Sequence, residues 1–293
     1  MLFFILFYRD YWISKSSNAY AHVSPDGCHR GKITTKSDTS NLINNGRFVG
    51  DKMLLTPQDV VCCPPPLFHC FGLVMGFLGA FTHGSSIVFP SDQFDAHCVL
   101  DAIATEKCTA LLGVPTMFLA EMEANKQKKL KITTVRTGLA AGSLVPFAVM
   151  QSLQEEMNIH NMLIAYGMTE TSPVTFITSL DDPLERRLKT VGRVMPHTNA
   201  KIVDRDGNIV PKGTRGEICV SGYMLQKGYW NNKAMTDDVM KPDENQVVWM
   251  HTGDEGTLDK EGYCTITGRI KDIIIRGINP ILSKTNQSYF LAD

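Results

Sequence analysis

A polar loop in the middle of the chain combines residue types that suit a phosphate and a metal ion. It lies in the stretch IAYGMTETSP, residues 164–173, where an apolar run ends at Tyr166 and Gly167. The glycine permits a tight turn, and Thr169 and Glu170 follow it closely. Hydroxyls and exposed amides suit phosphate oxygens, a carboxylate suits a hard cation such as Mg²⁺, and the tyrosine ring can lie against a purine. Taken alone, the stretch is better explained as a polar loop with a helix cap.

Two charged residues nearer the end of the chain suit a ribose. In WMHTGDEG, residues 249–256, Asp254 follows an expected strand and a glycine. A single carboxylate can accept hydrogen bonds from both hydroxyls of a ribose. Arg269, in GRIKD, carries a cation that can reach the same ribose or an adjacent phosphate. Taken singly, Asp254 could be a turn residue and Arg269 a surface charge.

Three other features do not predict a site. The stretch GCHRGKI, residues 27–33, fails as a phosphate-binding loop because its glycines are too close together and Ile33 stands where a Ser or Thr would hold Mg²⁺. The stretch DRDGN, residues 204–208, is expected to be a hairpin turn, since no Glu completes a calcium loop. The 8 cysteines include no C-x-x-C pair, which favours reduced thiols in an intracellular compartment over a zinc site.

The elements that must position these residues divide the chain into two halves. Between residues 60 and 177, strand-like runs such as CTALLG and MLIAYG alternate with helix-length amphipathic segments such as PTMFLAEMEANKQKK. This alternation predicts an α/β fold with a mostly parallel sheet flanked by helices, whose ligand sites lie at the carboxyl ends of the strands. Pro115 and Pro146 are expected near helix starts.

After residue 191 the pattern changes to strand, turn, strand, which predicts a smaller β-rich subdomain. AKIVDRDGNIV and LDKEGYCTITG are expected to form hairpins. The predicted divisions are a poorly ordered segment over 1–40, an α/β subdomain over 41–190, a β-rich subdomain over 191–268, and a hinge with a divergent tail over 269–293.

Composition excludes several classes of partner. The chain has 293 residues, 43% of them hydrophobic, and a formal net charge of -1, so no excess of basic residues favours nucleic acid. The apolar run of residues 2–7 is far shorter than the roughly 20 residues of a membrane-spanning helix. The start also lacks a recognisable secretory signal or mitochondrial presequence.

Four motifs, in order, carry a family resemblance. YGMTETSP, GEICVSGYMLQKGYWNNKAMT, WMHTGDEGTLDKEGYCTITGR and GRIKDIIIRG resemble the adenylate-forming enzymes, which include acyl-CoA ligases, luciferases and peptide-synthetase adenylation domains. The resemblance covers about residues 38–277, and AYGMTETSPVTF with TGLAAGS is most similar to the mitochondrial medium-chain acyl-CoA ligases. It implies ATP-dependent ligation of a fatty acid to coenzyme A through an acyl-adenylate, with Mg²⁺. It also implies a mitochondrial location, the alternative being cytoplasmic.

The resemblance also implies roles for individual residues. Thr169 would bind phosphate and Glu170 would hold Mg²⁺, as the catalytic pair. The nucleotide contacts would be shared by adenine-binding and ribose-binding residues: Ala141, Gly142, Ser143, Tyr166, Gly167, Asp254 and Arg269. His69 matches the gate of the acyl pocket, and the apolar helix that begins at Phe71 would wall that pocket or simply pack in the core. Asp272 matches the hinge of a small C-terminal domain.

The sequence departs from the family pattern at both ends. HRGKITTKSDT stands where the family has a loop rich in Ser, Thr and Gly that wraps the outer phosphates. After Gly277 the sequence departs from the family again, and we expect the C-terminal domain with its catalytic lysine to be missing. A well-placed cation at a phosphoryl centre is typically worth about 10³ to 10⁵ in rate. We therefore expect weak or absent turnover, the alternative function being a non-catalytic nucleotide-binding and acyl-binding or regulatory form.

Overall fold

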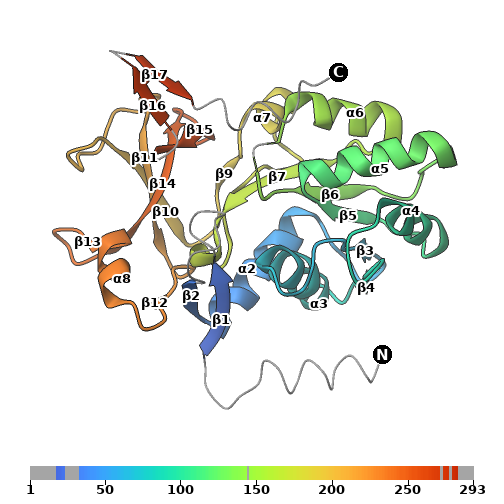
Figure 1. Cartoon of the computed structure of the whole chain (residues 1–293), viewed down its shortest axis with the longest axis horizontal. Helices are drawn as coiled ribbons and strands as arrows, with labels where there is room; N and C mark the ends of the chain where they lie inside the picture. Colours follow the sequence, from blue (N-terminus) through green and yellow to red (C-terminus); the bar gives the residue numbers. More distant parts are fainter. Residues whose placement is uncertain (1–17, 24–32, 144, 271–272, 277–278, 283–293) are drawn as a thin grey trace.

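Two regions of different architecture contain most of the described residues. The computed structural model describes residues 18–23, 33–143, 145–270, 273–276 and 279–282. One region is a sheet covered by helices on both faces, and the other is built almost entirely of strands (Figure 1). The α/β class predicted from the sequence, with a β-rich part after it, is confirmed.

The helix-covered region is built on a seven-stranded sheet in the order β4-β3-β5-β6-β7-β8-β9. Neighbouring strands from β4 to β7 are parallel, whereas β8 and β9 join antiparallel at one edge. The sheet is therefore mostly parallel, as predicted. In sheet order the strands are β4 Ser86–Val88, β3 Val60–Cys62, β5 Ala110–Gly113, β6 Thr137–Ala140, β7 Met162–Gly167, β8 Val174–Ile177 and β9 Arg193–Val194.

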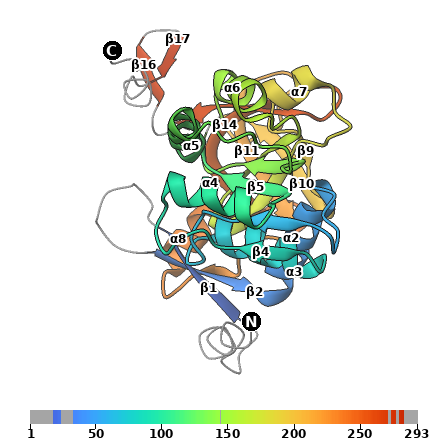
Figure 2. The same cartoon turned by 90° about the vertical axis from the view of Figure 1, so that its right-hand side faces the viewer.

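Both faces of this sheet are buried, because apolar side chains point alternately to each side. Leu111 of β5 packs with one helical layer, while its neighbours Ala110 and Leu112 pack with the other. Figures 1 and 2 show the two layers on opposite sides of the sheet. The first layer consists of α4 Ala96–Thr105, α5 Pro115–Lys128 and α6 Phe147–Met157, and the second of α2 Thr39–Lys52, the π-helix η1 Phe71–Leu78 and α3 Gly79–Thr82.

Local sequence explains how several of these helices begin. Pro115 occupies the first turn of α5, where its missing N–H costs no hydrogen bond. Asp95 precedes α4, and its side chain accepts a hydrogen bond from the Cys98 N–H at 2.9 Å. Pro146 stands one residue before α6. The proline signals in the sequence therefore marked these two helix starts to within one residue.

The β-rich region is an antiparallel sheet in the order β10-β11-β14-β13, with β15 also paired to β14. Its core includes Ile218, Val220 and Met250, and Phe176 from β8 packs into the same core and so joins the two regions. One expectation is corrected here: β10 pairs with β11, and the residues after the 204–208 turn contribute only a single bridge. The strands are β10 Thr198–Val203, β11 Gly216–Gly222, β13 Met240–Pro242, β14 Val248–Leu258 and β15 Cys264–Arg269.

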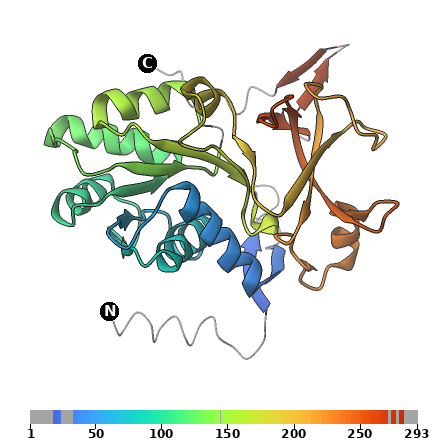
Figure 3. The same ribbon diagram turned by 180° about the vertical axis from the view of Figure 1, so that it is seen from behind.

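A small third sheet, β1-β2-β12, was not predicted. It pairs β1 Asn18–Val23 and β2 Ile33–Asp38 with β12 Gly228–Tyr229. Figure 3 shows α2 leading from this sheet toward the seven-stranded one. The remaining elements are the 3-10 helix η2 Thr169–Thr171, α7 Leu184–Lys189, α8 Lys233–Val239, and a hairpin of β16 Ile273–Arg276 and β17 Asn279–Leu282.

The structure bears on two further expectations about the chain. Asp272, the expected hinge residue, lies outside the described residues. None of the helices in the described part of the chain combines the length and the apolar content that crossing a membrane requires.

Candidate nucleotide site

The Asp254 carboxylate joins the two regions of the molecule. Tyr166, at the end of β7, donates its hydroxyl to Asp254 Oδ2 at 2.6 Å, and Arg269 Nε lies 3.3 Å from Oδ1. Asp254 and Arg269 face each other across the β14–β15 ladder. Contrary to the prediction that it follows a strand, Asp254 lies within β14, just before a bulge. The bulge changes the local register, which is how strands often re-aim side chains at functional sites.

Tyr166 is held as a hydrogen-bond donor. Burial raises the pKa of Tyr166 well above its usual range, and the nearby Asp254 charge raises it further. The ring also packs against Phe176, with 6.1 Å between centroids. The phenol therefore stays protonated at neutral pH and supports the carboxylate.

Glu170 is a second buried carboxyl in this site. It lies in η2, is 5% exposed, and its Oε1 accepts a hydrogen bond from the Tyr229 hydroxyl at 2.9 Å. Its pKa is raised by burial, and the Tyr229 hydrogen bond and the Arg269 charge oppose that rise. The Tyr166–Asp254 hydrogen bond brings the end of β7, which leads into the Glu170 loop, to the β14–β15 hairpin.

Thr169 is in contact with the loop that precedes η1. Its hydroxyl lies 3.6 Å from Cys70 Sγ, and the Phe71 N–H donates to His69 Nδ1 at 3.1 Å. Because Nδ1 accepts, a neutral His69 ring carries its proton on Nε2. Phe71 is 1% exposed and packs in the core against α2 and α3.

Glycines shape the strand ends beside this loop. Ala141 and Gly142 follow β6, which pairs with β7, so they share its carboxyl edge. Gly142 has φ +89°, a conformation that favours glycine, and a Cβ there would lie 3.0 Å from Val114. A Cβ on Gly167 would lie 1.9 Å from the Pro173 carbonyl oxygen. Ser143, next in the chain, is exposed at the same edge.

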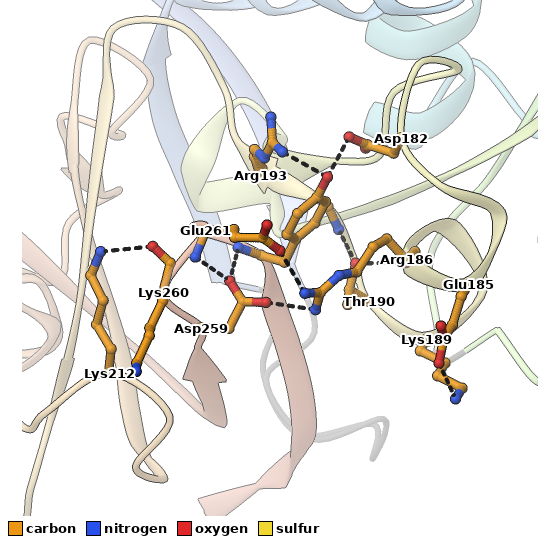
Figure 4. A network of polar contacts seen from close by, with 12 residues as sticks. Asp182, Glu185, Arg186, Lys189, Thr190, Arg193, Lys212, Asp259, Lys260 and Glu261 are labelled. Carbon is orange, nitrogen blue, oxygen red and sulfur yellow. Dashed lines mark hydrogen bonds and ion pairs between the residues drawn. The ribbon is translucent and has the colours of Figure 1, made fainter.

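A second polar cluster fixes the β14–β15 hairpin to the α/β region (Figure 4). The Tyr263 hydroxyl donates to Asp182 at 2.8 Å and accepts from Arg193 at 2.7 Å. Arg186 lies over the Tyr263 ring and pairs with Asp259 at 2.7 Å. The turn between β14 and β15 is thereby tied to α7 and β9, which restrains the hairpin that carries Asp254 and Arg269.

The chain matches a known family over most of its length. Residues 35–230 match the family described as AMP-binding enzyme. The chain belongs to the AMP-binding enzymes. The elements that supply Tyr166 and Glu170 lie within the matched residues, whereas Asp254 and Arg269 follow them.

Relatives of this AMP-binding enzyme include acyl-CoA ligases. It is 56% identical over 237 residues to acyl-CoA ligase sidI of Aspergillus fumigatus, a match covering 81% of this chain and 40% of that protein. It is 42% identical over 240 residues to the mitochondrial medium-chain acyl-CoA ligase ACSF2 of Danio rerio, covering 81% and 39%. The chain thus spans about 40% of the length of these relatives.

Solved structures of adenylate-forming enzymes share the fold. ATP-bound MatB from Rhodopseudomonas palustris superposes with a TM-score of 0.81 at 26% identity, over 94% of this chain and 53% of that one. O-succinylbenzoate coenzyme A synthetase from Bacillus subtilis, in complex with ATP and magnesium, gives 0.77 at 25% identity, over 91% and 54%. The fold predicted from the four motifs is confirmed.

The residues expected from the sequence fall into three groups in this AMP-binding enzyme. Tyr166, Glu170, Asp254 and Arg269 come together, while Thr169 meets the His69 loop through Cys70. The three residues after β6 lie at the sheet edge that β6 shares with β7. Tyr229 has no role predicted from the sequence. In the sequence, Tyr229 stands out only as part of the stretch GYWNN within a quoted motif. Its contact with Glu170, 59 residues away, cannot be predicted from residue spacing.

Proposed function

We propose that this AMP-binding enzyme takes part in ATP-dependent ligation of a carboxylic acid to coenzyme A. In the first step a carboxylate oxygen of the acid attacks the α-phosphorus of ATP and pyrophosphate leaves. In the second step the thiol of coenzyme A, on losing its proton, attacks the acyl carbon and AMP leaves. The first step is needed because a carboxylate oxygen leaves poorly until it is bonded to phosphate, and fixed charges must meet the charge that builds on phosphorus.

The observation that carries the proposal is the junction of Tyr166, Asp254 and Arg269. The tyrosine hydroxyl contacts one oxygen of the Asp254 carboxylate and the arginine lies beside the other, so the carboxylate is held in a fixed position. A single carboxylate can accept hydrogen bonds from both hydroxyls of a ribose. Arg269 has 64% of its side chain exposed, so its outer nitrogens suit an adjacent phosphate.

Mg²⁺ belongs to the same proposal, with Glu170 as its protein ligand and Thr169 as a phosphate contact. The support is the donor set, since Glu170 Oε1 accepts from Tyr229 and a hard cation suits the other oxygen. Mg²⁺ commonly takes one or two carboxylates together with substrate phosphates and waters. When bound, it would offset the negative charge of those phosphates.

The acid that we propose is a medium-chain fatty acid, and the proposed location is mitochondrial. Both rest on the similarity to ACSF2, whose name states them. Ligase sidI, which is more similar, has a name that states no chain length. The stretch PLFHCFG adds support for an apolar acid, because it offers His69 and Cys70 and no carboxylate to hold the ammonium group of an amino acid.

The test uses the full chain and a non-hydrolysable adenylate analogue carrying an octanoyl group. Calorimetry should detect binding, with a weaker signal for a hexadecanoyl analogue if the site prefers medium chains. Pyrophosphate release from ATP, Mg²⁺ and octanoate then measures the first step, for which we propose weak turnover by this chain. Binding with no pyrophosphate would favour the alternative, a nucleotide-binding and acyl-binding form without turnover. Absence of binding by either analogue would contradict the proposed site.

A further inference from the structure

Three potential metal ligands converge on the outer face of the β-rich sheet. Glu217 and Cys219 are two residues apart on β11, so their side chains point to the same face. Cys219 faces His251 across the β11–β14 ladder. Ile218, which lies between Glu217 and Cys219 in the sequence, points to the other face and packs in the core. His251 lies 32 residues from Cys219 in the sequence, so C-x-x-C spacing does not reveal this cluster.

The distances suit a tetrahedral metal ion. Cys219 Sγ lies 3.5 Å from His251 Nδ1, Glu217 Oε2 lies 2.7 Å from the same nitrogen, and all three atoms lie within 4.8 Å of one another. Ligand atoms around Zn²⁺ sit about 2.0 to 2.3 Å from the ion, which places them about 3.4 Å apart in a tetrahedron. The sulfur and nitrogen already have this separation, whereas Glu217 Oε2 must move roughly 0.7 Å farther from the nitrogen.

We propose that Glu217, Cys219 and His251 bind a Zn²⁺ ion, with a water as the fourth ligand. Cys219 is fully buried, while the Glu217 and His251 side chains are 21% and 22% exposed, so the ion enters from their side. On that side an open hollow is lined by Lys201, Lys241, Trp249 and other residues of the sheet. The water ligand lies toward this hollow, as in sites that keep one open position.

Binding of the ion displaces one proton. Burial raises the pKa of the Cys219 thiol to about 12, so the sulfur is protonated without metal. The thiol proton leaves to solvent as the S–Zn bond forms, and neutral His251 donates the Nδ1 lone pair while its proton resides on Nε2. The nearby cations Lys201 and Lys241 favour the thiolate and oppose the incoming metal charge.

Glu217 links this site to the proposed nucleotide site. Its other oxygen, Oε1, accepts a hydrogen bond from the Gly253 N–H at 3.0 Å, directly before Asp254. Gly253 has φ +73°, so the backbone turns there. A metal ion on Oε2 would hold the glutamate in the position that supports this turn. Ligands whose remaining atoms are hydrogen-bonded in this way are oriented for the metal.

The distances among Glu217, Cys219 and His251 are also compatible with a cluster that holds no metal, in which His251 Nδ1–H donates to Glu217. Cobalt(II) separates the two cases, because it occupies zinc sites and absorbs light. The metal-free full chain is titrated with CoCl₂ and then with ZnCl₂. A near-ultraviolet thiolate-to-cobalt band that zinc removes is expected, at one equivalent. Absence of that band in the natural chain would overturn the proposal.

Matched variants assign the band to these residues. Cys219→Ser should abolish the band. His251→Gln and Glu217→Gln should each weaken Zn²⁺ binding by at least about tenfold, because a loss of that size is typical even when only a residue hydrogen-bonded to a metal ligand is replaced. Cys98→Ser is the control, because Cys98 is a partly exposed thiol beside Asp95 on α4. Zinc should also raise the Tm of the natural chain and of Cys98→Ser, but not that of Cys219→Ser. A band that persists in Cys219→Ser, or disappears in Cys98→Ser, would contradict the site.

Discussion

The molecule contains two clusters of the same three residue types, and both join the α/β region to the β14–β15 hairpin. In one, Tyr166 donates to Asp254 and Arg269 pairs with that carboxylate. In the other, Tyr263 donates to Asp182 and Arg193 donates to the phenol oxygen. Both clusters contain a tyrosine, an aspartate and an arginine, but the residues around them differ. These neighbouring residues decide what each cluster can do.

The side chains of the Tyr263 cluster make several contacts with other side chains of the protein. Arg193 and Arg186 lie 4.3 and 4.9 Å from the ring centroid, and Arg186 also pairs with Asp259 and Glu261 (Figure 4). The Asp254 cluster instead lies beside the carboxyl end of β7, where α/β folds bind ligands, and its arginine is mostly exposed. We therefore assign a structural role to the first cluster and propose a binding role for the second.

Asp254→Ala should produce the largest effect on nucleotide binding. The variant removes acceptors for both ribose hydroxyls, and hydrogen bonds to a charged group are worth about 1.5 to 3 kcal/mol each. AMP affinity should fall by about 3 kcal/mol, or roughly 150-fold, as measured by calorimetry. Asp204→Ala, in an exposed turn of the β-rich region, is the control and should leave the affinity unchanged. An equal loss in both variants would contradict the assignment.

One buried carboxyl group contrasts with the hydrogen-bonded carboxylates of the two clusters. Glu121 on α5 is fully buried, and neither of its oxygens has a hydrogen-bond partner among the described residues. Glu121→Met should raise the free energy of unfolding at neutral pH by about 2 kcal/mol, because it removes an unpaired buried polar group. Urea unfolding measures the change. Glu123→Met, on the exposed side of the same helix, should change stability by less than about 0.5 kcal/mol.

The gain from Glu121→Met should also depend on pH. Burial raises the pKa of Glu121 well above 4.5, so the folded state keeps a proton that the unfolded state releases. The glutamate therefore destabilises the fold increasingly as pH rises through the unfolded pKa toward the folded one. The gain should be larger at about pH 8 than at about pH 5. A gain independent of pH would mean that the carboxyl titrates alike in both states.

Much of the fold could be predicted because local signals agree with it. The apolar runs and the proline at residue 115 predicted β5, β7 and α5 in their observed places. Asp254 and Arg269 each lie in a motif that could be read from the sequence, and the structure pairs them across the β14–β15 ladder. What failed depends on long-range pairing: β2 pairs with β12, and Tyr229 reaches Glu170 across 59 residues. The Cys219–His251 pair is set by the β11–β14 register, which shifts at a bulge that spacing does not reveal.

Tyr263→Phe should mainly affect stability. The change removes the hydrogen bond to Asp182 and leaves Arg193 without that acceptor, which should lower the free energy of unfolding by about 1.5 kcal/mol. Asp182 still accepts from the Ser179 N–H, so it does not become an unpaired charge. Urea unfolding tests this, with AMP titration as the control. An AMP affinity that fell as far as in Asp254→Ala would place this cluster in the binding site.

Tyr166→Phe deletes the same atom in the other cluster and should have the smallest effect of the four on binding or stability. The ring remains available to a purine, and Arg269 still pairs with Asp254. Loss of one supporting hydrogen bond should weaken AMP binding by about 1 kcal/mol, or roughly fivefold. The two tyrosine variants are compared by AMP titration and urea unfolding in the same buffer. If the comparison holds, AMP affinity changes in Tyr166→Phe and not in Tyr263→Phe, because only the first hydroxyl contacts a carboxylate that the ribose would share.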